Sequence, residues 1–140
     1  MTQATGTPNG CAPRSAERRW AQAGPFLDDA LAHAHGTHEI DDVLAAIAEG
    51  RLQLWLGERC AGVTEILTFP RKRMLNLFLA GGDLQEMKTL QPGLEAFARA
   101  HACDGVMFSG RLTASASRAS GWGRAWPDYR PTHISFCKEI

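Results

Sequence analysis

Residues 51–83 read RLQLWLGERCAGVTEILTFPRKRMLNLFLAGGD. Leucine recurs at every second position of residues 52–56, and this period of two predicts a β-strand. Residues 63–69 give a second strand pattern. The nearly continuous apolar residues 74–80 predict a third strand that is covered on both faces of its sheet. Because only short turns separate these segments, we expect the three strands to form an antiparallel meander.

Two helices are predicted before the meander. The dipeptide Gly24-Pro25 opens the first helix, since proline suits the first helical position, and Gly36 follows its end. The second helix has Thr37 as its N-cap and ends at Gly50. Its apolar residues recur at helical spacing and give one apolar stripe.

A long helix is predicted after the meander. Asp83 and Glu86 have the spacing of a capping box at its start, and the helix reaches about residue 102. Pro92 lies inside this helix and should kink it or start a second segment, since proline removes a backbone donor. The buried strand that follows, residues 106–109, indicates a crossover between parallel neighbours.

The two ends of the chain differ in character. Residues 1–19 show no apolar period and predict a flexible arm, whereas residues 20–140 are expected to form a single domain. Residues 112–120 have the composition of a loop. A short helix over 121–126 and a last strand over 132–138 complete the predicted order of elements.

The composition limits the classes of function. The apolar fraction of 44% and the charged fraction of 21% are ordinary for a globular domain. Lys+Arg and Asp+Glu both total 15, so the net charge is zero, which disfavours a dedicated nucleic-acid binder and is compatible with self-association. No stretch is apolar enough to span a bilayer or to serve as the core of a signal peptide, so we expect a cytoplasmic protein without a membrane partner.

No metal site is expected from the cysteines or the histidines. The four cysteines lack a CxxC pair and are interpreted as reduced thiols. His33, His35 and His38 are closely spaced, but positions 33 and 35 of one helix face about 200° apart. Arg71-Lys72-Arg73 is interpreted as a solvated hairpin tip.

Glu65 is the candidate catalytic residue. In the alternation of residues 63–69 it shares a side of the strand with apolar neighbours. A carboxylate that is desolvated there has a raised pKa and can act as a general base. The alternatives are a glutamate at the sheet edge or one that is paired with a nearby arginine.

Several short motifs are distinctive: Gly50-Arg51-Leu52-Gln53-Leu54-Trp55, Val63-Thr64-Glu65-Ile66, Ala80-Gly81-Gly82-Asp83-Leu84, Gly110-Arg111, and Gly121-Trp122 with Arg124. In these motifs the chain resembles the small GNAT-like proteins, of acyl-CoA N-acyltransferase fold, that phages and prophages encode. The resemblance implies an α/β (α+β) fold with a mixed central sheet, which contains the antiparallel three-strand meander and has helices on both faces.

The resemblance also bears on a cofactor. Acetyltransferases of this fold hold the pyrophosphate of acetyl-CoA at a glycine-containing turn at the start of the long helix, where backbone N–H groups and the helix dipole bind the anion. It therefore implies Gly81 and Gly82 as cofactor-binding residues. Asp83 departs from the pattern, because its carboxylate competes for the same N–H groups. We accordingly expect no cofactor, with acetyl-CoA the cofactor if the protein is an enzyme.

The leading hypothesis is a phage- or prophage-encoded GNAT-like protein without acetyltransferase activity. It would be a virion-associated or assembly component that contacts other phage proteins or itself, in the host cytoplasm or incorporated in the virion, with no specific nucleic-acid partner. One alternative is an acetyl-CoA-dependent N-acetyltransferase with Glu65 as its base. The other is a host-directed binding module. Tyr129, the only tyrosine, is interpreted as a packing or hydrogen-bonding residue and not as a general acid.

Overall fold

The computed structural model describes residues 13–34, 36–109, 126–132, 136 and 138–140. Two compact units divide the chain, Met1–Phe108 and Ser109–Ile140, and each is described by itself. All helices and strands of the described residues belong to the first unit. Their order is α1 (Pro13–Leu31), α2 (Ile40–Ala48), β1 (Leu52–Leu56), β2 (Cys60–Thr68), β3 (Arg73–Gly82), α3 (Leu84–Thr89), α4 (Gln91–Ala100) and β4 (Gly105–Phe108). The single domain over residues 20–140 stays a prediction.

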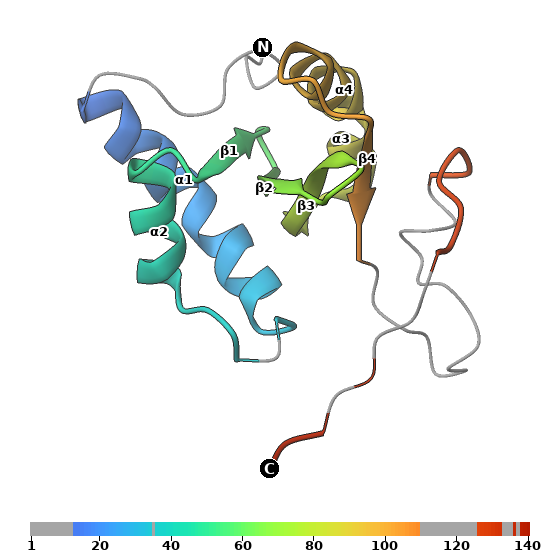
Figure 1. Ribbon diagram of the computed structural model, residues 1–140. Helices are drawn as coiled ribbons and strands as arrows, with labels where there is room; N and C mark the ends of the chain where they lie inside the picture. Colours follow the sequence, from blue (N-terminus) through green and yellow to red (C-terminus); the bar gives the residue numbers. More distant parts are fainter. Residues whose placement is uncertain (1–12, 35, 110–125, 133–135, 137) are drawn as a thin grey trace. The chain divides into compact units, whose positions relative to one another are not determined.

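The four strands form one mixed sheet in the order β1-β2-β3-β4. The first three pair antiparallel, which confirms the predicted meander. β4 pairs parallel with β3 after the crossover through α3 and α4, again as predicted. Helices α1 and α2 lie on one side of the sheet, and α3 and α4 lie on the other (Figure 1).

The face toward α1 and α2 is an apolar core. Alternate strand residues meet side chains of the two helices, since successive side chains of a strand point to opposite faces. The buried members of this cluster are Ala23, Leu27, Ala30, Val43, Ala46, Ile47, Leu52, Leu54, Ala61, Val63 and Leu79. This packing positions the β3–α3 turn beside α1.

The opposite face contains a buried chain of polar side chains. The Trp55 indole Nε1 donates to the Thr64 hydroxyl (2.9 Å), which in turn donates to Gln53 Oε1 (2.8 Å). The Trp55 ring also meets the Phe97 ring of α4 edge-on, with 5.6 Å between centroids. These three buried polar side chains thus bond to one another, which removes most of the cost of burying them.

A β-bulge interrupts the pairing of β2 with β3. Val63 is opposite Leu79 and Thr64 is opposite Leu77, so Phe78 is an extra residue on β3. The bulge changes which face the odd-numbered residues occupy. Leu77 lies beside Gly62 and the α3 side of the sheet, whereas Leu79 belongs to the core with α1 and α2.

Helix α1 differs from the prediction, because it begins at Pro13 and contains Pro25 in its interior. The prediction that Pro25 opens the helix is wrong, and α1 also includes residues 13–19, which the sequence analysis assigned to the arm. Tertiary packing outweighs the donor that Pro25 removes, since Ala23 and Leu27 on either side of it are fully buried. Residues 1–12 lie outside the described part of the chain.

The start of α2 also differs. Glu39 and not Thr37 is the N-cap, with a reciprocal capping box to Asp42. Thr37 instead completes the turn after α1, since its hydroxyl donates to the carbonyl of Ala34 (2.9 Å). Gly36 adopts a φ of +70° in this turn, a conformation that favours glycine.

The long helix after the meander is divided into α3 and α4. Pro92 lies in the first turn of α4, which confirms that it starts a second segment. In the second unit, positions 132, 136 and 138 are in no strand, so the last strand predicted over 132–138 is absent at its described positions. Tyr129 packs near Trp126, with 6.3 Å between ring centroids. The predicted loop 112–120 and the region 121–125 lie outside the described residues.

Gly81 provides a test of the contact between α1 and β3. A Cβ at this position would collide with the backbone carbonyl of Phe26, which cannot move without shifting α1. We expect Gly81→Ala to lower the free energy of unfolding by about 2 kcal/mol in a urea titration. Gly24→Ala is the matched control, because nothing lies within 4 Å of its Cβ position. An equal loss in both variants would contradict the close approach.

Candidate functional site

The turn between β3 and α3 is the first candidate, since the family resemblance implies an anion site there. Asp83 is the N-cap of α3, and its Oδ1 accepts from the backbone N–H of Glu86 (2.9 Å). Its own N–H donates to the Arg59 carbonyl (2.8 Å). The predicted N-cap is confirmed, and the Asp83 carboxylate therefore occupies the first turn of α3, as the sequence analysis expected.

Gly81 and Gly82 line this turn, but their contacts are internal. Gly81 lies against the carbonyl of Phe26. Gly82 has a φ of +98°, and a Cβ there would lie 2.7 Å from the Cα of Cys60. Close backbone packing and the left-handed conformation thus account for both glycines without a ligand. At this turn the Asp83 carboxylate takes the Glu86 N–H and the Arg59 carbonyl takes the Asp83 N–H, so neither donor is directed at a pyrophosphate. The assignment of Gly81 and Gly82 as cofactor-binding residues stays a prediction.

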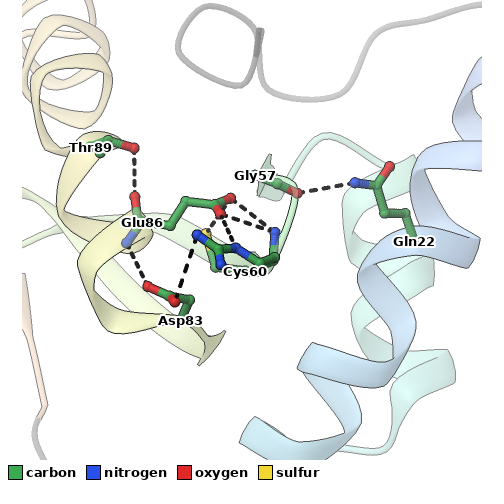
Figure 2. Close-up of polar contacts among 7 residues, drawn as sticks. Gln22, Gly57, Cys60, Asp83, Glu86 and Thr89 are labelled. Carbon is green, nitrogen blue, oxygen red and sulfur yellow. Dashed lines mark hydrogen bonds and ion pairs between the residues drawn. The ribbon is translucent and has the colours of Figure 1, made fainter.

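The Glu86 carboxylate joins the β1–β2 turn to α3 through contacts with Arg59 and Cys60, which we call the Glu86 clasp (Figure 2). Its two carboxylate oxygens accept from the Arg59 N–H at 3.0 and 3.2 Å, and Oε2 also lies 3.4 Å from Arg59 Nε. The Cys60 thiol contacts Oε1 at 3.6 Å. The expected capping box is therefore half present, since the Glu86 carboxylate turns to Arg59 and not to the N-cap.

The two ionisable groups of the clasp, the Glu86 carboxyl and the Cys60 thiol, have pKa values that shift in opposite directions. Burial raises the pKa of Glu86, but the hydrogen bonds from the Arg59 N–H, the Cys60 thiol and the Arg59 guanidinium outweigh it, so the pKa is lowered from its ordinary 4.5. Burial and the adjacent Glu86 carboxylate raise the pKa of Cys60 to about 12. The Cys60 thiol is therefore no nucleophile at neutral pH, and the clasp is a structural junction.

The clasp predicts a pH dependence of stability. Since the pKa of Glu86 is lower in the folded than in the unfolded chain, its contribution is complete above its ordinary pKa of 4.5 and is lost as the pH falls through the lowered value. We expect Glu86→Gln to cost about 1 kcal/mol at pH 7 and to remove this part of the acid dependence. Chemical denaturation between pH 7 and pH 3 measures it.

Glu49→Gln is the control for this experiment, because Glu49 pairs with Arg51 on the surface with both side chains more than half exposed. Such a pair contributes about 0.5 kcal/mol or less, and its removal should leave the acid dependence unchanged. A constant difference between Glu86→Gln and the unmodified chain over the whole pH range would contradict the assigned pKa direction.

Glu65 forms the second candidate, together with a residue that the sequence analysis did not identify. The two are cross-strand neighbours, and Asn76 Nδ2 donates to Glu65 Oε2 (2.8 Å). Asn76 Oδ1 is buried and has no hydrogen-bond partner among the described residues. A buried acceptor without a partner costs about 1–3 kcal/mol, so this atom calls for an explanation. Both side chains are half-buried. Within the described part of the chain, neither alternative for Glu65, an edge position or an arginine partner, is seen.

The two candidates are separate places on the sheet. Asn76 precedes Gly81 by five positions on β3, about 16 Å at the usual rise of a strand. The structure therefore does not bring Glu65 into contact with the two glycines. The only feature that could have identified Asn76 from the sequence is its position opposite Glu65 in the paired strands. The bulge at Val63/Thr64 makes that pairing hard to deduce.

The remaining chemistry of the described residues is limited. No group of three or more His, Cys, Asp or Glu side chains that could hold a metal ion occurs within the part of the chain that the structure describes. His33 and His38 are exposed, and the His38 ring meets Phe78 edge-on at 4.7 Å between centroids. No helix among the described residues is long and apolar enough to cross a membrane.

Several solved structures share this fold. An aminoglycoside acetyltransferase from an uncultured soil metagenomic sample aligns with a TM-score of 0.63 and 8% identity over 92% of this chain and 93% of its own. A probable acetyltransferase aligns with a TM-score of 0.58 and 9% identity over 88% and 95%. The Thermus thermophilus protein TTHA1254 gives 0.55 and 9% over 89% and 92%.

These similarities define the class of fold and nothing finer. The chain has the GNAT-like acetyltransferase fold, which confirms the predicted mixed α+β architecture with helices on both faces. No protein-family model matches the sequence, and no curated protein matches it significantly.

Proposed function

We propose that this chain is a GNAT-like protein that does not transfer acetyl groups from acetyl-CoA and that acts through contacts with other proteins. The supporting observation is the Asp83 carboxylate at the first turn of α3, where it accepts from Glu86 N at 2.9 Å. In this fold the same position would have to receive the phosphates of the cofactor.

Charge supports the same proposal. The turn presents two carboxylates, Asp83 and Glu86, to any anion that approaches α3. The nearby cation Arg59 is already shared between them, at 4.0 Å from Asp83 and 3.4 Å from Glu86. A pyrophosphate would therefore meet two carboxylates and one cation from these residues, a net negative charge that disfavours an anion.

Calorimetric titration with acetyl-CoA tests the proposal. We expect no heat of binding at millimolar ligand, because the Asp83 carboxylate lies at the first turn of α3 and the N–H groups of Asp83 and Glu86 are bonded within the protein. A micromolar Kd for the unmodified chain, together with acetylation of an amine substrate, would contradict it.

A variant pair shows whether the Asp83 carboxylate is the obstacle. Asp83→Ser retains an oxygen that can cap α3 but removes the charge, so we expect weak acetyl-CoA binding to appear. Asp41→Asn removes one charge from the exposed side of α2 and should leave the titration flat. Equal behaviour of the two variants would mean that another feature excludes the cofactor.

A second candidate function is an N-acyltransferase that uses acetyl-CoA. The observation that favours it is Glu65, a half-buried carboxylate that a hydrogen bond from Asn76 holds in place on the sheet. A positioned carboxylate can accept a proton from an amine. Steady-state turnover that falls at least about 100-fold in Glu65→Gln would establish this function in place of the first.

The finer part of the proposal is that the chain is encoded by a phage or prophage and is a virion-associated or assembly component. Its support is the set of short motifs, of which Ala80-Gly81-Gly82-Asp83-Leu84 forms the end of β3 and the start of α3. We expect mass spectrometry of purified virions to contain this polypeptide. Its absence from virions, with capture of a host protein from lysate, would favour the host-directed binding module.

A further inference from the structure

One face of the sheet has half-buried side chains where β2, β3 and β4 lie side by side. We call it the Glu65 face. Cross-strand register assigns its members to one side of the sheet, the side of Leu52. The members are Glu65, Leu67, Met74, Asn76 and Met107.

Two acceptor groups lie together in the middle of this face. A carboxylate accepts only, so the hydrogen bond at 2.8 Å fixes the Asn76 amide with its NH2 group toward Glu65. The amide oxygen Oδ1 is then left as an acceptor, and it has no partner in the described part of the chain. Glu65 itself takes part in none of the salt bridges formed by the described residues, whose cations are Arg51, Arg59 and Arg99.

We propose that the Glu65 face binds an arginine side chain of a partner protein, with the guanidinium donating to the Glu65 carboxylate and to Asn76 Oδ1. This inference rests on the proposed function in protein contacts. It supplies the unsatisfied Asn76 acceptor with a donor and the Glu65 carboxylate with a cation, which is the charge complementarity that a docking surface requires.

Arginine fits these groups better than lysine does. The guanidinium is planar and presents several donors in a fixed fork, so it can serve two neighbouring acceptors at once. It is also more weakly hydrated than an ammonium group, which suits a half-buried position.

The apolar members of the face complete the site. Leu67, Met74 and Met107 offer surface to the methylene stem of an arginine, which usually lies along apolar side chains. Asn76 Oδ1 is shielded from solvent, so the guanidinium must displace a neighbouring side chain to reach it. Methionine is the residue best suited to yield, because it is unbranched and adapts its rotamer readily.

NMR titration of the full-length protein tests the proposal with three probes that share one backbone. They are the Nα-acetyl methylamides of arginine, of citrulline, which has nearly the same shape without the charge, and of lysine. We expect the arginine probe to shift the side-chain amide signals of Asn76 and the backbone amide of Met107 in a saturable way. The citrulline and lysine probes should bind at least about tenfold more weakly, since each lacks either the charge or the fork.

Two variants test whether the arginine probe binds at Glu65. We expect Glu65→Gln to weaken the arginine probe about tenfold, whereas Asp29→Asn, which removes one charge from an exposed position of α1, leaves it unchanged. The comparison of the three probes on the unmodified chain needs no variant, so it tests arginine binding at the Glu65 face even if Glu65→Gln fails to fold.

Other results of the titration would contradict the proposed arginine site. Equal shifts with arginine and citrulline would reduce the effect to apolar contact, and equal binding of lysine would overturn the choice of guanidinium. No saturable shift with arginine would remove the site altogether. Failure of the proposed function is read separately, since that failure is tight acetyl-CoA binding with turnover, whatever the arginine probe does.

Discussion

The extra residue in β3 sets the arrangement of the first unit. Without the bulge at Phe78, residues 75, 77 and 79 would all face one side of the sheet. The bulge lets Leu77 contact the α3 side while Leu79 enters the core beneath α1 and α2. It also places Asn76 on the same face as Glu65. One local irregularity thus determines both the apolar core and the pair of polar side chains farther along the same face.

The β3–α3 turn contains two adjacent glycines, and the hydrogen bonds of Asp83 at its end are internal to the fold. A glycine-containing turn followed by a helix is well suited to an anion, because free N–H groups converge there. In this chain the Asp83 carboxylate takes one such N–H, and the Arg59 carbonyl takes another donor of the turn. The Glu86 clasp then ties the same region to the β1–β2 turn. These hydrogen bonds join elements of the fold to one another, and the charge that remains at the turn is negative.

Local patterns in the sequence were sufficient for most of the sheet. The alternation in residues 52–56, the apolar run of β3 and the effect of Pro92 were all confirmed, because each depends on neighbours along the chain. The start of α1 was missed although Trp20, Ala23, Leu27 and Ala30 recur at spacings of three and four. The dipeptide Gly24-Pro25 masked that period, and only packing against the sheet shows that the helix passes through it.

The candidate sites were predictable in part for the same reason. Glu65 stood out because a carboxylate among apolar neighbours is a local signal. Its partner Asn76 could not be found, since their pairing depends on the register of two strands across a bulge. The N-cap role of Asp83 followed from spacing, but the partner of the Glu86 carboxylate is Arg59, 27 positions away. Contacts of that kind arise only when turns from different parts of the chain meet.

The way in which Arg59 serves the clasp has a consequence for how this position tolerates change. Its N–H and carbonyl carry the contacts to Glu86 and Asp83, whereas its side chain is 73% exposed. Any amino acid except proline supplies the same backbone groups, so a substitution here removes only the guanidinium contacts at 3.4 Å to Glu86 and 4.0 Å to Asp83. The same freedom makes it a suitable attachment point for a spectroscopic label, which would report on the junction between the β1–β2 turn and α3 while leaving the backbone contacts in place.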